Sequence, residues 1–189
     1  MINNIFMEKY LKQKYKGKVY VTLKNNIPIG FTLNRENVWN KFNGLFIERY
    51  IAESNASFLQ LIPYIIIKNN DDYLITKNTS YELGYSFHIQ NENILNDVLY
   101  QSILSYLNRT FNFNNRYIIN HFGYVRLLKG KHLFICFTID IDKDSIHLLD
   151  TEITAGWVNK QYLYDNSMKF SQTSKYIIDF FYSKEKYNI

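Results

Sequence analysis

Residues 95–107 carry the first pattern that could support chemistry. Apolar residues recur there every four positions, at Leu95, Leu99, Ile103 and Leu107. This spacing predicts an amphipathic helix. Ser102, Ser105 and Tyr106 lie three and four residues apart on it, so we expect them to share one face. Their neutral hydroxyl groups can hydrogen-bond a ligand, but they cannot supply the anionic oxygens that Mg²⁺ prefers.

Strand patterns before and after this helix indicate three hairpins. The apolar run 61–67 and the strand 73–76 flank a polar turn at 69–72, and the strands 117–127 and 132–141 flank Gly130. Because the run 61–67 has no polar alternation, we expect it to be central and covered on both faces. An N-terminal hairpin is predicted from strands 18–24 and 27–33 around Asn25-Asn26.

The remaining elements complete an α+β domain with a mixed β-sheet between helices. Short strands are predicted at 84–90, 146–149 and 154–158, followed by a short helix through Tyr164 that Asn159 caps and a closing helix at 171–182. Alternating lysines at 12, 14, 16 and 18 fit either a solvated edge strand or an anion-binding stripe.

Composition limits the class of protein. A chain of 189 residues with 47% hydrophobic content is expected to fold around one core. The net charge of +5 could support binding to anions, but it comes from 22 basic and 17 acidic residues spread along the chain, so alone it is a weak signal for nucleic acid and we do not expect a nucleic-acid partner. Neither a signal peptide nor a membrane span is recognisable, so we expect a soluble cytoplasmic protein without a membrane partner. The single cysteine, Cys136, lies in an apolar run and excludes an intrachain disulfide and a cysteine-based zinc cluster.

Four segments, in order, resemble one branch of the Nudix hydrolase family. Residues 58–67 (FLQLIPYIII) resemble its Gln-x-Ile-Pro-Tyr-Val-Val strand, and residues 84–92 (GYSFHIQNE) resemble its Gly-Phe-Gly-Gly-His-Ile-Asn segment. Residues 152–159 (EITAGWVN) are similar to its late Glu-x-x-x-Gly-Trp-Val strand, and residues 168–181 to its final helix. The resemblance implies a Nudix-like α/β/α sandwich, with an N-terminal extension at 1–39 that carries the hairpin and a Nudix-like domain at 40–189.

The chain departs from the family where the family's chemistry resides. The Nudix box has a Gly-Gly turn and a helix with Arg-Glu-Leu-x-Glu-Glu, whose carboxylates hold the metal. The corresponding positions here are Ser86 and Phe87 for the two glycines, and Gln101, Ser102, Ser105 and Tyr106 for the arginine and the three glutamates. The resemblance therefore implies a degenerate box without a metal cofactor.

The resemblance also places candidate residues around the ancestral site. The tentative ligand-binding set is Tyr85, Phe87, His88, Ser102, Ser105, Tyr106 and Trp157. Phe87 either fills the phosphate space or supports the core, and we expect His88 to make a structural hydrogen bond rather than act as an acid or base. A substitute metal cluster could come only from Glu92, Asp97 and Glu152.

Three functional hypotheses follow. The first is a catalytically inactive domain that binds a nucleotide-like small molecule or a protein partner. The second is a divergent hydrolase of nucleoside diphosphate derivatives that uses Mg²⁺ or Mn²⁺ on the substitute cluster. The third is a protein-interaction module, such as a homodimer, whose old pocket is closed by Phe87 and Tyr106.

Overall fold

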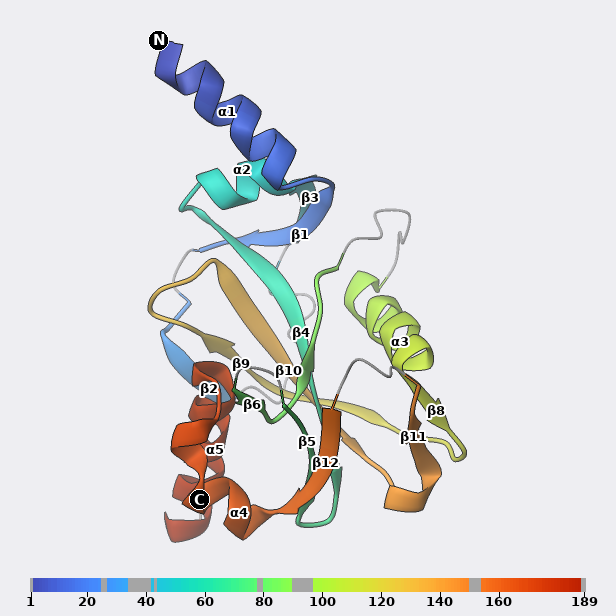
Figure 1. Cartoon of the computed structure of the whole chain (residues 1–189). Helices are drawn as coiled ribbons and strands as arrows, with labels where there is room; N and C mark the ends of the chain where they lie inside the picture. Colours follow the sequence, from blue (N-terminus) through green and yellow to red (C-terminus); the bar gives the residue numbers. More distant parts are fainter. Residues whose placement is uncertain are drawn as a thin grey trace.

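A computed structural model of the chain describes residues 2–24, 27–33, 42, 44–77, 80–89, 97–149 and 154–187 (Figure 1). The helices are α1 (Ile2–Lys14), α2 (Arg49–Ser54), α3 (Val98–Thr110), α4 (Lys160–Asp165) and α5 (Gln172–Tyr187), with 3₁₀ helices η2 (Lys143–Ser145) and η3 (Ser167–Lys169). The strands are β1 (Lys18–Leu23), β2 (Gly30–Leu33), β3 (Leu45–Glu48), β4 (Phe58–Asn69), β5 (Asp72–Lys77), β6 (Tyr81–Glu82), β7 (Tyr85–Ser86), β8 (Phe111–Phe113), β9 (Ile119–Arg126), β10 (His132–Asp140), β11 (Ile146–Leu148) and β12 (Thr154–Asn159).

Strand β4 is the centre of a mixed sheet. One edge of β4 pairs in parallel with β10 from Gln60 to Lys68. The main path of this sheet is β12-β5-β4-β10-β9-β2, with β1, β3, β6 and β7 paired off this path, and its remaining strand pairs are antiparallel. Strands β8 and β11 form a separate antiparallel pair. Residues 59–67 are all buried, as expected for a strand that is covered on both faces.

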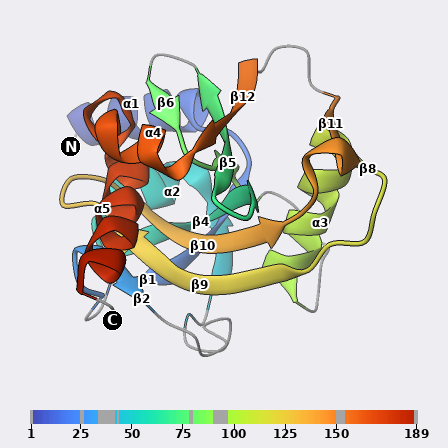
Figure 2. The same ribbon diagram turned by 90° about the horizontal axis from the view of Figure 1, so that it is seen from below.

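Alternate residues of β4 face two different cores. Ile65 and its odd-numbered neighbours pack with Ile103 and Leu107 of α3, whereas Tyr64 and Ile66 pack with Ile177 of α5. Helices α3 and α5 accordingly lie on opposite sides of the central strands (Figure 2). This arrangement is an α/β/α sandwich, which confirms the predicted fold class.

Several predicted local features are confirmed. Strands β4 and β5 form a hairpin across Asn70, which adopts a positive φ of 51°, and β9 pairs antiparallel with β10. Asn159 caps α4, because its side-chain oxygen accepts a hydrogen bond of 2.8 Å from the backbone N–H of Tyr162. Cys136 is fully buried, as its position in an apolar run indicates.

The predicted N-terminal hairpin is wrong. Strand β1 pairs with β3 and β4, whereas β2 pairs with β9. Burial decides this pairing, since Val19 and Val21 of β1 pack against Ala52 of α2 in a small core of their own. The boundary between residues 39 and 40 stays a prediction, because both lie outside the described residues.

Two other predicted segments also differ from the structure. Lys12 and Lys14 belong to α1, so the lysines do not alternate along an extended strand. The predicted strand at 84–90 is reduced to β7, Tyr85–Ser86, and Gln90 lies outside the described residues. The second edge of β4 is shared in succession by β1, β7 and β5, which leaves β7 only a short stretch to pair with.

Candidate ligand site

The three polar residues predicted to share one face of this helix, Ser102, Ser105 and Tyr106, do not all share it in α3. Ser102 is buried, and its Oγ has no hydrogen-bond partner among the described residues, whereas Ser105 is exposed. At about 100° per residue, Ser105 lies roughly 150° around the helix from the buried stripe of Leu99, Ile103, Leu107 and Thr110. The expectation of one shared face therefore fails for Ser105, and only Ser102 and Tyr106 remain on the side toward the sheet.

Phe87 and Tyr106 form a stacked aromatic pair. Their ring centroids are 4.2 Å apart, and the ring planes differ by 10°. Both side chains are half-buried and pack against the core between α3 and the sheet. Because rings at this distance are in van der Waals contact, no planar ligand fits between them unless they separate.

Arg109 adds a positive charge next to this pair. Its guanidinium carbon lies 5.9 Å from the centroid of the Tyr106 ring, at the edge of cation–π distance. Arg109 is exposed, and none of the described carboxylates forms an ion pair with it. Guanidinium groups bind phosphate with paired hydrogen bonds, so the site can receive an anion at this point.

Tyr85 lies deeper on the same side of the sheet. Its ring is 4% exposed and meets the edge of Phe111 at a centroid distance of 4.8 Å. Burial, with a smaller contribution from Tyr106, raises the pKa of Tyr85 well above its usual value, so the phenol stays neutral. Its Oη, like the Ser102 Oγ, has no hydrogen-bond partner among the described residues.

His88 belongs to a different cluster, although it follows Phe87 directly. Its ring meets His132 at 5.3 Å, and Arg49 and Glu53 of α2 contribute to its electrostatic environment. Burial, reinforced by Arg49 and His132, lowers the pKa of His88 to about 4. The imidazole is therefore neutral at physiological pH. The predicted structural hydrogen bond is not seen for Nδ1, which has no partner among the described residues.

The lowered pKa of His88 predicts acid sensitivity. An unfolded histidine titrates near pH 6.5, so between pH 6.5 and 4 the unfolded state binds more protons and the free energy of unfolding falls. With allowance for partial exposure, we expect His88 to account for about 1–2 kcal/mol of this loss. Urea unfolding at pH 7, 5.5 and 4 should show a smaller loss for His88→Gln than for the parent. The exposed His147→Gln is the control, and equal losses in both variants would contradict the assignment.

Trp157 lies on β12 opposite Leu74 of β5 and packs against the same core as Phe87 and Tyr106. The Nζ of Lys143 lies 5.6 Å from the centroid of its ring. Among the described ring contacts, none joins Trp157 to the Phe87–Tyr106 pair. Its inclusion in the ligand site stays a prediction.

Only Asp97 of the substitute metal cluster can be located. Asp97 is exposed at the N-terminal end of α3, where it has a left-handed backbone with φ 53° and makes no side-chain cap. Glu92 and Glu152 lie outside the described residues. Within the described ranges, no three His, Cys, Asp or Glu side chains are grouped in a way that could hold a metal ion.

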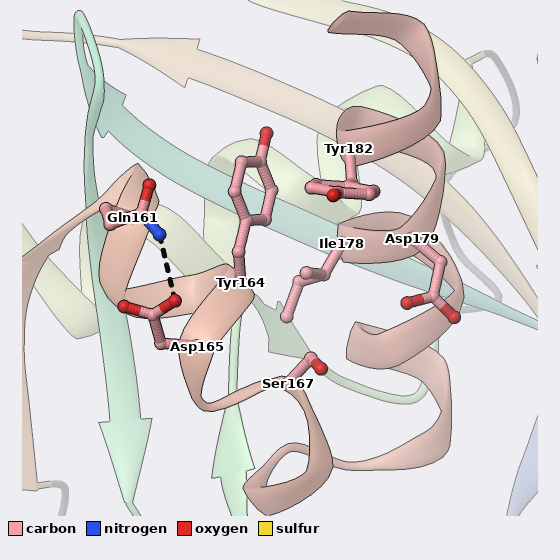
Figure 3. A pocket seen from close by; sticks show the side chains of 7 residues that line it. All are labelled: Gln161, Tyr164, Asp165, Ser167, Ile178, Asp179 and Tyr182. Atoms are coloured by element: carbon pink, nitrogen blue, oxygen red, sulfur yellow. Dashed lines mark hydrogen bonds between the residues drawn. The ribbon is translucent and has the colours of Figure 1, made fainter. Parts of the chain in front are cut away.

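A cavity of about 380 Å³ lies on the opposite side of the sheet, between α4 and α5 (Figure 3). It is lined by Gln161, Tyr164, Asp165, Ser167, Ile178, Asp179 and Tyr182. The Gln161 side-chain amide donates to the Asp165 carboxylate at 2.8 Å, and Tyr164 meets Tyr182 edge-on at 5.1 Å. None of the candidate residues from the sequence lies in this cavity.

Arg109 is the residue that the sequence analysis did not identify. A lone basic residue in the last turn of a helix is ordinarily explained by the helix dipole, so its type and position gave no functional signal. Only its proximity to the Tyr106 ring connects it to the site.

Comparisons with known proteins address the fold. No protein-family model matches the chain, and no curated protein matches it. Among solved structures, the chain is similar to Tm1382, named as a candidate Nudix hydrolase, with 20% sequence identity and a TM-score of 0.74. The match covers 87% of this chain and 97% of Tm1382. In addition, none of the described helices is long and apolar enough to cross a membrane. The comparison establishes a Nudix-like fold.

Proposed function

We propose that this chain is a Nudix-like domain that binds an anionic, nucleotide-like ligand and does not hydrolyse it through a metal on α3. The observation that carries the proposal is the neutral inner side of α3. Ser102 and Tyr106 face the sheet there, and Phe87 stacks on Tyr106. Without carboxylates at these positions, α3 cannot hold the divalent ion that would activate water.

Three groups near this side of α3 match the parts of a nucleotide. The Phe87–Tyr106 pair offers a flat aromatic surface on which a base can stack. Arg109 supplies a guanidinium for a phosphate. The Ser102 Oγ and the Tyr85 Oη are buried hydroxyl groups that lack a described partner, which favours a polar ligand over a sealed apolar contact.

The closed interaction module is the second candidate, because the stacked pair occupies space that a ligand would need. This candidate function differs from the binding function in the expected effect of truncating Phe87. Removal of Phe87 would then weaken packing without changing the response to any nucleotide. The divergent hydrolase depends on Glu92 and Glu152 and is tested in the same experiment.

The experiment combines thermal shift with turnover. Nucleoside diphosphate sugars, dinucleotides and nucleoside triphosphates are added to the protein in EDTA, and the same panel is assayed for hydrolysis with Mg²⁺ and Mn²⁺. We expect at least one compound to raise the melting temperature, by roughly 5–10 °C at a hundredfold excess over Kd. Phe87→Ala and Arg109→Gln should each reduce that shift.

Matched controls separate the site from general packing and charge. Phe122→Ala removes a half-buried ring on the α5 side, and Arg116→Gln removes an exposed arginine that has no part in the site. Both should leave the shift unchanged. No shift with any compound would favour the interaction module. Metal-dependent turnover that Glu92→Gln or Glu152→Gln abolishes would establish the hydrolase instead.

A further inference from the structure

The positive charge of the chain is concentrated near its N-terminal end. Residues 8–18 contain five lysines and one glutamate, a net charge of +4, whereas the whole chain carries +5. The rest of the chain is therefore close to neutral, with a net charge of +1. The basic excess is therefore a local feature of residues 8–18, and a basic cluster in one segment is a stronger signal for a nucleic-acid partner than the same charge spread along the chain.

Helix α1 presents this charge away from the body of the protein. It projects from the sheet and approaches α2 at its C-terminal end (Figure 1). Lys9, Lys12 and Lys14 are exposed on it, and Lys16 is exposed in the segment that follows. Glu8 is the only acidic residue among residues 8–18, and its carboxylate pairs with the Lys12 Nζ at 2.6 Å.

Tyrosine rings are interleaved with these lysines. The Nζ of Lys14 lies 5.2 Å from the Tyr15 ring centroid and 5.8 Å from that of Tyr10, and the Nζ of Lys12 lies 5.0 Å from that of Tyr50 on α2. Tyr10 is 55% exposed, so one of these rings is largely open to solvent. We define the α1 surface as Lys9, Lys12, Lys14, Lys16, Tyr10 and Tyr15. Lys9 and Lys12 share one side of α1, whereas Tyr10 and Lys14 lie on the other, so a bound strand would pass around the helix.

We propose that the α1 surface binds single-stranded nucleic acid, with the lysines on the phosphates and Tyr10 stacked on a base. Exposed cations interleaved with aromatic rings are the combination that single strands require, since phosphates supply charge and every base has a face to stack on. The site is independent of the α3 site, so either proposal can fail alone.

The same helix is poorly suited to a membrane surface. A helix that lies on lipid needs its apolar residues gathered on one face. On α1 the apolar Met7 and Leu11 share one side of the helix, but Lys14, three residues after Leu11, lies on that side too, so a charge interrupts the apolar face. Anionic vesicles therefore serve as the competing probe.

Binding is tested on the full chain with a fluorescein-labelled 20-nucleotide single strand, measured by anisotropy between 50 and 200 mM NaCl. Four phosphate contacts predict a slope of log K against log salt of about −3, which is about a 50-fold loss of affinity across this range. Replacing Lys9, Lys12 and Lys16 together by Gln should bring the slope to about −0.7. The same three positions changed to Arg should keep the parental slope.

A triple Gln variant at the exposed Lys77, Lys129 and Lys169 should bind like the parent. Tyr10→Ala should lower affinity at least fivefold, whereas Tyr10→Phe should not. The proposal is overturned by absence of binding at 50 mM NaCl, by equal effects of the two triple Gln variants, or by tighter binding to phosphatidylserine vesicles or to polyphosphate of equal charge.

Discussion

Replacing Ser102 by glutamate is expected to lower the free energy of unfolding by about 3 kcal/mol, and Mg²⁺ is not expected to restore it. Ser102 is 8% exposed on the side of α3 that faces the sheet, and its hydroxyl has no described partner. A carboxylate placed there would lose hydration without gaining an ion pair. For a chain of this length, the melting temperature should fall by roughly 6–12 °C.

The pH dependence of the unfolding free energy shows whether the carboxylate charge causes the loss of stability in Ser102→Glu. Burial raises the pKa of a carboxyl group, so the penalty is present at neutral pH and disappears below about pH 4, where the group is neutral in both states. The difference in unfolding free energy between Ser102→Glu and Ser102→Gln should therefore shrink as the pH falls from 7 to 4. Urea unfolding at both pH values measures this difference.

The neighbouring serine provides the matched control. Ser105 is exposed one turn along the same helix, so Ser105→Glu should change stability by less than about 0.5 kcal/mol. Recovery of Ser102→Glu by millimolar Mg²⁺ would mean that other groups near α3 can complete a metal site. That result would support the divergent hydrolase and count against the proposed binding function.

Strong local patterns allowed much of the fold to be predicted. The continuous apolar run of β4 and the four-residue spacing of α3 reflect burial of whole faces, and these faces are what the two cores contain. The β4–β5 and β9–β10 hairpins were predictable because their strands are close in sequence. Strands β1 and β2 are also close in sequence, yet their partners are distant strands. Competition among strands for the edges of the sheet decides such pairing, and no local pattern records it.

The candidate site was predictable only in part. Spacing brought Ser102, Ser105 and Tyr106 together, but it did not show which of them the sheet covers, since that depends on where the buried stripe lies. The stack of Phe87 on Tyr106 joins residues from different elements, and the sequence brought these two residues together only in the hypothesis of a closed pocket. Arg109 gave no signal, because its significance comes from a ring in space rather than from its neighbours in sequence.

Gly84→Ala is the second change with a large expected effect, a loss of about 3 kcal/mol in the free energy of unfolding. A Cβ at Gly84 would lie 2.5 Å from Cε1 of Tyr64 and 2.9 Å from the carbonyl oxygen of Ile65. Neither neighbour can move easily, because β4 is buried and the Gly84 N–H donates to the Tyr64 Oη at 3.0 Å. The same Oη lies 2.7 Å from the Ser174 Oγ on α5, so a shift of Tyr64 also disturbs the core between the sheet and α5.

Gly156→Ala is the control, because a Cβ at Gly156 meets nothing within 4 Å, and its stability should change by less than about 0.5 kcal/mol. Equal unfolding free energies for the two variants in urea would show that the Gly84 backbone has room to adjust. A large difference would separate two roles in the segment at 84–87. Gly84 would then be required by the fold for its close approach to Tyr64, whereas the correspondence of Ser86 and Phe87 to the family's two glycines rests on the sequence resemblance alone and stays a prediction.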